Sequence, residues 1–181
     1  MDRAILKIIL YCTGIMVIIS LWLLVCADGK EIHSLLSYVF IMIFGYIAMI
    51  SDWITKRIPN SLILSMFAIW LVIAVTQMFI DTKTGIQLLT DSMLGFVTGG
   101  GLFLLVYLIS RKGLGGGDVK FMAAAGLFLG FSLTVPVVLY GTVLAALTGM
   151  ALILLKKIGR KDAIPLAPFL YAGILITVFI A

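Results

Sequence analysis

Residues 61–80 read SLILSMFAIWLVIAVTQMFI, a stretch without a charged side chain. A helix that spans the hydrocarbon core of a bilayer needs about 20 predominantly apolar residues. The rest of the chain repeats this pattern, because 63% of its 181 residues are hydrophobic, 12% are charged and the mean hydropathy is +1.26. A soluble domain has about 45–50% apolar and about 25% charged residues. The sequence therefore predicts an all-α, polytopic membrane bundle and excludes a soluble, a disordered or a disulfide-stapled domain.

The apolar spans predict about six to seven membrane helices in one membrane-embedded domain, residues 1–181, with an extra N-terminal helix before a core of residues 35–181. The fifth span is short, so it is either a tilted crossing or a re-entrant half-helix. The first could instead be a cleaved signal peptide, although its apolar stretch exceeds the usual h-region of about 7–15 residues. The spans are Ile5–Cys26, Leu35–Ser51, Ser61–Ile80, Asp91–Ser110, Val119–Phe131, Leu133–Leu155 and Ile164–Ala181.

Basic residues alternate between the segments that flank these spans. Alternate segments carry 11 of the 13 Lys and Arg residues, and the positive-inside rule places those segments in the cytoplasm. This orientation predicts a multi-pass protein of the cell membrane with a cytoplasmic N-terminus. The net charge of +5 comes from basic residues that flank the apolar spans and set their orientation. The lipid bilayer is therefore a predicted partner, and nucleic acid is not.

Cysteine and histidine usage predicts no metal and no cofactor. Cys12 and Cys26 form no CxxC pair, His33 is the single histidine, and a structural zinc site needs about four ligands.

Small residues recur at four-residue spacing in three spans, which lets helix backbones approach closely. The spacing favours packing inside one bundle and leaves homo-oligomerisation as the alternative. The residues are Gly95 and Gly99, then Gly126 and Gly130, then Gly141, Ala145 and Gly149.

Two aspartates differ from the acidic residues of the loops. Asp52 follows the uncharged span Leu35–Ser51, and Asp118 opens the fifth span; both lie at predicted cytoplasmic helix ends. An ionisable group near membrane depth is costly and indicates a function. Two carboxylates in one site share a proton, so that one can activate water while the other polarises a peptide carbonyl. The spacing alone leaves open that they are two separate interfacial aspartates.

Glycine and proline mark the chain around these aspartates. Residues 115–117 are all glycine, which predicts irregular backbone lining a wet cavity, with Gly117 at positive φ. A phosphate loop is not indicated, because the run ends in an acid rather than in Gly-Lys-Ser/Thr. Pro59 fits just before the third span, which Asn60 or Ser61 is expected to cap. Asp91 is expected to cap the fourth span from the outer side.

Together these motifs resemble those of the prepilin peptidase family, the type IV leader peptidases. Residues 52–60, DWITKRIPN, resemble the family's aspartate followed by a basic stretch and Ile-Pro-Asn, and residues 115–120, GGGDVK, resemble its Gly-x-Gly-Asp motif followed by lysine. The resemblance continues through Ala123-Ala124-Ala125-Gly126, Gly130 and residues 164–170, IPLAPFL. It covers roughly residues 35–175, and the two motifs in this order make it specific.

The resemblance implies a bilayer-embedded aspartic endopeptidase of the GxGD type, with Asp52 and Asp118 as the catalytic pair. Its substrates would be type IV prepilins or pilin-like precursors, used for pili or protein secretion and cut at the cytoplasmic face behind a basic leader. The chain resembles the short, peptidase-only type, because it has no CxxC and no room for a methyltransferase site. Supporting roles are implied for Gly115 and Gly117 in shaping the turn, for Lys56, Arg57 and Lys120 in tuning the pair, and for Pro59 and Asn60 in the structure.

Other interpretations remain at the level of sequence. A presenilin-like protease shares the Gly-x-Gly-Asp motif, and an archaeal preflagellin peptidase would use the same chemistry. A small ion-coupled transporter could use Asp52 and Asp118 as ion sites, but it predicts internal repeats and midplane charges that the sequence lacks. A catalytically dead assembly protein is a further alternative.

Overall fold

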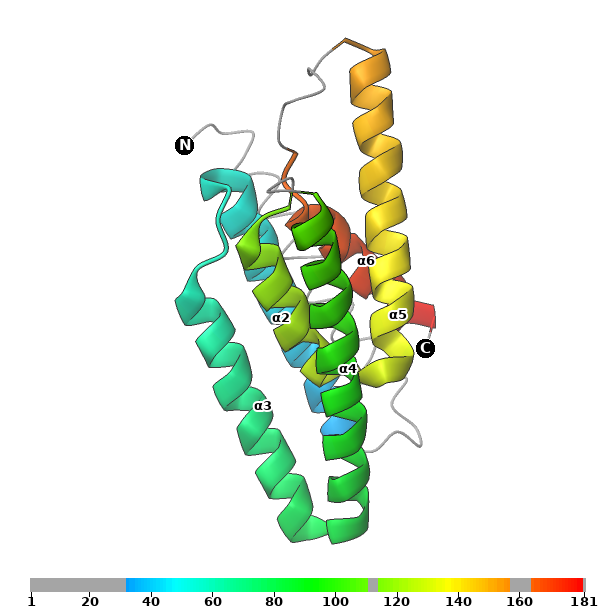
Figure 1. The fold of residues 1–181 in the computed structure, drawn as a ribbon. Coiled ribbons are helices and arrows are strands. Elements are labelled where there is room, and N and C mark those ends of the chain that lie inside the picture. The colour runs from blue at the N-terminus through cyan, green and yellow to red at the C-terminus, as the bar shows by residue number, and fades with distance from the viewer. Residues whose placement is uncertain (1–31, 111–113, 157–163, 181) are drawn as a thin grey trace.

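The computed structural model describes residues 32–110, 114–156 and 164–180, and every regular element in those ranges is a helix. The predicted all-α bundle is thereby confirmed (Figure 1). Within these ranges, four helices are long and apolar enough to cross a membrane, and α6 is a shorter apolar helix. The predicted first span, Ile5–Cys26, lies outside the described residues. The helices are α2 (Ile32–Thr55), α3 (Asn60–Ile80), α4 (Thr82–Ile109), α5 (Gly116–Leu154) and α6 (Ala167–Ile180).

Helix α4 begins at Thr82, well before the predicted start at Asp91. The cause is Asp81, whose side chain accepts hydrogen bonds from the Lys83 N–H at 3.0 Å and the Thr84 hydroxyl at 3.0 Å. These bonds cap the first turn of the helix, and they lower the pKa of Asp81. The prediction that Asp91 opens and caps this span is therefore wrong.

Helix α5 is broken at Gly130, where φ is 67° and ψ is −179°. The chain turns back on itself there (Figure 1), two residues before position 132, where the boundary between the fifth and sixth spans was predicted. The first half, residues 116–129, is about 21 Å long at 1.5 Å per residue. The second half, residues 131–154, carries Pro136 and packs against α6. Positive φ suits glycine because it has no Cβ.

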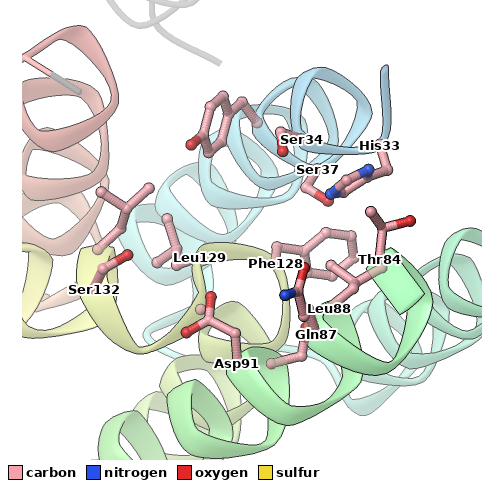
Figure 2. Close-up of a pocket in the computed structure, with 14 residues that line it drawn as sticks. His33, Ser34, Ser37, Thr84, Gln87, Leu88, Asp91, Phe128, Leu129 and Ser132 are labelled. Atoms are coloured by element: carbon pink, nitrogen blue, oxygen red, sulfur yellow. The ribbon is translucent and has the colours of Figure 1, made fainter. Parts of the chain in front are cut away.

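Two neighbouring residues of α4 satisfy the backbone groups that this break sets free. In an unbroken helix the N–H of Phe131 would donate to the carbonyl of Leu127. Instead, Phe131 N–H donates to Asp91 Oδ1 at 3.1 Å, and the Leu127 carbonyl accepts from the Ser92 hydroxyl at 2.7 Å. Ser92 also accepts from Trp70 Nε1 of α3 at 3.1 Å. Asp91 is thus a helix cap, but for the second half of α5 rather than for its own helix. Figure 2 shows Asp91 of α4 beside the part of α5 that carries Leu129 and Ser132.

The small residues lie where helices pack most closely. A Cβ on Gly99 of α4 would lie 2.6 Å from the Met122 carbonyl of α5, and one on Gly173 of α6 would lie 2.7 Å from the Val137 carbonyl. Gly95 and Gly126 approach one another in the same way. The predicted packing inside one bundle therefore accounts for these positions, and homo-oligomerisation stays a prediction.

Candidate active site

Asp52 lies in the last turn of α2 and is 7% exposed. Its Oδ2 accepts a hydrogen bond from the backbone N–H of Ala167 at 3.1 Å. Ala167 is the first residue of α6, so the carboxylate lies at the N-terminus of that helix, where negative charge is favoured. Lys56, the residue that follows this helix, takes the left-handed conformation with φ 51°, and it lines the same cavity as Asp52.

Asp118 lies in the first turn of α5 and is 9% exposed. Gly115 is the N-cap residue of this helix, and its carbonyl accepts from the Asp118 N–H at 3.1 Å. The Gly115 backbone N–H in turn donates to the Asp118 carboxylate. An acidic side chain at the third helical position that bonds back to the N-cap is the arrangement of a capping box. The helix start therefore fixes where this carboxylate points.

Both aspartates line one cavity of about 270 Å³. They are close enough for the charge of one to act on the other. The residues predicted from the two motifs are therefore brought together from positions 66 apart in the chain. The remaining lining residues are Lys56, Arg57, Ile58, Asn60, Gly115, Gly116, Gly117 and Lys120.

The glycine run departs from the sequence-based expectation. Gly116 and Gly117 are part of α5, and Gly130 is the only glycine with positive φ among the described residues. The prediction of irregular backbone with positive φ at Gly117 is therefore wrong. A Cβ on Gly117 would meet Ile58 at an ordinary 3.4 Å, and one on Gly116 would meet nothing within 4 Å. A Cβ on Gly115, however, would lie 2.9 Å from Asp118 Oδ2.

Polar contacts hold the connection between α2 and α3 beside the cavity. The hydroxyls of Ser51 and Thr55 each donate to the Arg57 carbonyl at 3.0 Å. Ile58, in the same connection, is buried. These three positions were not predicted from the sequence, although a hydroxyl near a helix end often bonds to a nearby carbonyl.

Asn60 and Lys120 join α3 to α5 at the rim of the cavity. Lys120 Nζ donates to Asn60 Oδ1 at 3.1 Å. Asn60 begins α3, and the N-cap residue is Pro59, which has no side-chain cap bond. The expectation that Asn60 or Ser61 caps the helix is therefore wrong. The Lys120–Asn60 bond links the two motifs directly.

Ala167 is the functional contact that sequence reasoning missed. Ala167 lies in the predicted span Ile164–Ala181 and in the segment 164–170 that belongs to the resemblance described above. However, the sequence does not show that a backbone N–H at position 167 meets a carboxylate at position 52.

The fold and the cavity define a helical membrane protein with two buried aspartates at one site. Residues 39–150 match the type IV leader peptidase family. Because this match covers more than half of the chain, the protein belongs to that family.

Curated relatives carry the name prepilin leader peptidase/N-methyltransferase. The protein of Bacillus subtilis (strain 168) is 30% identical over 81 residues, which are 45% of this chain and 33% of the relative. The protein of Aeromonas hydrophila is 32% identical over 91 residues, which are 48% of this chain and 31% of the relative. The chain thus spans about a third of the length of these relatives. No solved structure matches the chain.

Proposed function

We propose that this protein is an aspartic endopeptidase of the cell membrane that removes the leader from type IV prepilins or pilin-like precursors. The observation that carries the proposal is the meeting of two buried carboxylates, Asp52 and Asp118, at one cavity. Family membership supports a leader peptidase function. The printed name of the relatives supports prepilins as the substrate class.

The proposed reaction is hydrolysis of one peptide bond by a water molecule held between the carboxylates. Two adjacent carboxylates share one proton, because they do not both ionise easily in one site. The ionised group takes a proton from water while the protonated group donates to the peptide carbonyl oxygen. The hydroxyl adds to the carbonyl carbon, and the departing amine leaves with the proton from water, so that an acid and an amine form.

The backbone contacts give each carboxylate a fixed position for this reaction. Ala167 N–H holds Asp52, and Gly115 N–H holds Asp118. Positioning of reacting groups is a large part of catalysis, since a displacement of about 1 Å can reduce a rate roughly 100-fold. Side chains that only line the cavity, such as Lys56 and Arg57, are proposed to tune its charge.

The side of the membrane follows from the charge pattern. Lys56, Arg57 and Lys120 lie at the same cavity as both aspartates, and basic residues concentrate on the cytoplasmic side. The active site is therefore proposed to face the cytoplasm. The proposal covers peptidase chemistry alone, because the sequence contains no CxxC pair.

The test is cleavage of a type IV prepilin in membranes that contain this protein or its Asp52→Asn or Asp118→Asn variant. Each variant should abolish release of the leader at equal membrane abundance, because asparagine keeps the volume but cannot exchange the proton. Cleavage at the normal rate by either variant would refute the proposal. Loss of ion-coupled uptake with cleavage intact would point to the transporter alternative.

A further inference from the structure

A second polar cavity lies at the end of the bundle away from the two aspartates. It has a volume of about 240 Å³ and is lined by the first turns of α2, the first part of α4 and the break in α5 (Figure 2). Gly130 at this cavity is twelve residues along α5 from Asp118, which is about 18 Å. His33 at this cavity is nineteen residues along α2 from Asp52, which is about 28 Å. The cavity is therefore separate from the candidate active site.

This cavity lies where the first half of α5 ends. That half is about 21 Å long, whereas the hydrocarbon core of a bilayer is about 30 Å thick. Among the described residues, α2 and α4 make no close backbone contact with one another. Beside the break, both of these helices present polar side chains to the cavity, namely Ser34 and Ser37 on α2 and Gln87 and Asp91 on α4 (Figure 2). The space between α2 and α4 is therefore suited to a polar ligand.

Asp91 gives the cavity a negative charge. It lies nine residues, or about 14 Å, after the start of α4, and it is exposed although its Oδ1 accepts the Phe131 N–H. Among the described residues that line the cavity, Asp91 is the only carboxylate, and no lysine or arginine is present. A carboxylate within a membrane span is costly and usually has a partner. The cavity therefore favours a ligand with a positively charged group.

An apolar groove borders this polar cavity. His33 and Thr84 line both, so the cavity and the groove share one edge. The groove has a volume of about 670 Å³ and lies between α2 and α3. It follows α3 from Ile80 to Ile69, which is about 16 Å along the helix and close to half of the roughly 30 Å hydrocarbon core. Its apolar lining residues are Leu36, Phe40, Ile69, Val72, Ile73 and Ile80.

A polar cavity with one carboxylate thus shares an edge with an apolar groove that is one leaflet long. A small polar solute would occupy the cavity alone. A membrane-spanning helix would need a surface about 30 Å long, which is roughly twice the length of this groove. A phospholipid matches both features, because a polar headgroup and an acyl chain meet at its glycerol.

We infer that the cavity and the groove together bind one phospholipid whose headgroup ends in a primary ammonium, as in phosphatidylethanolamine. The ammonium lies beside Asp91, the glycerol lies beside His33 and Thr84, and one acyl chain lies between α2 and α3. A primary ammonium has three N–H donors, which the Asp91 carboxylate and the Gln87 amide oxygen accept. A trimethylammonium headgroup has no such donors, and a headgroup with a net negative charge is repelled by Asp91.

Lipid titrations of the purified full chain in detergent test the headgroup. The measurement is the lipid concentration that gives half of the maximal rise in melting temperature, for phosphatidylethanolamine, phosphatidylcholine and phosphatidylglycerol with identical acyl chains. Phosphatidylethanolamine should bind roughly 10- to 100-fold more tightly than the other two, the range expected for hydrogen bonds to a charged group. Equal binding of the three lipids would overturn the inference. Glycerophosphoethanolamine has no acyl chains and should not raise the melting temperature, and an equal rise with it would show that the groove binds no lipid.

Two variants test the two parts of the site separately. Asp91→Asn keeps an oxygen that accepts the Phe131 N–H but removes the charge, so it should abolish the preference for phosphatidylethanolamine. A preference that persists in this variant would overturn the inference, and the comparison of lipids on the unmodified protein decides the headgroup even where Asp91→Asn does not fold.

Val72→Trp should fill the groove and weaken phosphatidylethanolamine binding by roughly 5- to 100-fold, the range expected when a filled apolar site is overpacked. Leu71→Trp is the matched control, because Leu71 is 55% exposed on the same helix but does not line the groove. Unchanged binding by Val72→Trp, or an equal loss in Leu71→Trp, would overturn the position assigned to the acyl chain.

Discussion

Replacing Gly115 by alanine should displace the carboxylate of Asp118 without disturbing the helix that carries it. The added Cβ would lie 2.9 Å from Asp118 Oδ2, whereas ordinary contacts begin at 3.4 Å. The carboxylate oxygen therefore has to move by about 0.5 Å to restore an ordinary contact. A displacement of a reacting group by about 1 Å can reduce a rate roughly 100-fold. We expect a roughly tenfold fall in kcat, which corresponds to about 1.4 kcal/mol of activation free energy. Gly115 has φ −73°, so alanine introduces no backbone strain there.

The assay is the initial rate of prepilin cleavage in membranes, normalised to the amount of enzyme. Gly116→Ala is the matched control, because a Cβ at that position would meet nothing within 4 Å. Gly117→Ala should also retain activity, since its Cβ would make an ordinary contact with Ile58. Equal rates for Gly115→Ala and Gly116→Ala would refute the reasoning that the bare backbone at Gly115 positions Asp118.

Three further predictions concern stability, orientation and protonation. Ser92→Ala should lower the unfolding free energy by about 1–3 kcal/mol, because it leaves the buried Trp70 Nε1 and the Leu127 carbonyl without their hydrogen-bond partner. A normal melting temperature in detergent would contradict this. Ser65→Ala is the control, because Ser65 is exposed. Cysteine labels at Lys56 and Gly116 should react from the cytoplasm, and a label at Lys83 should react from outside. Labelling of Gly116 and Lys83 from the same side would be incompatible with the orientation that the basic residues predict. The pH profile of kcat/KM should be bell-shaped, because the pair works with one proton; a profile with a single limb would count against a shared proton.

The helices, and the side of the bundle on which the two aspartates lie, could be predicted because these features depend on local patterns of polarity and charge. An uncharged stretch such as residues 61–80 fixes a span by length and polarity, and α3 occupies Asn60–Ile80. The charge pattern predicted that Asp52 and Asp118 lie on one side, and the structure places both at one cavity. These features depend on composition and order along the chain, which the sequence contains in full.

The features that the sequence did not reveal depend on contacts between distant segments. Asp91 was interpreted as a cap for its own helix, but it caps Phe131 of α5, because the helix break at Gly130 creates a free N–H beside it. The glycines at 116 and 117 were expected to be irregular because glycine is a poor helix former. They are helical, since the carbonyl and N–H of Gly115 cap the first turn. The Ala167 contact joins residues that no local pattern relates.

The central claim is that Asp52 and Asp118 act as one catalytic unit, and a double-mutant comparison tests it most directly. The measurement is the rate of leader release by Asp52→Asn, Asp118→Asn and the double variant at equal membrane abundance. Residues that act as a unit are strongly non-additive, because removal of either one already abolishes their joint action. The account predicts that the double variant is no slower than either single variant. Losses that multiply in the double variant would contradict a shared site and show two aspartates that contribute independently.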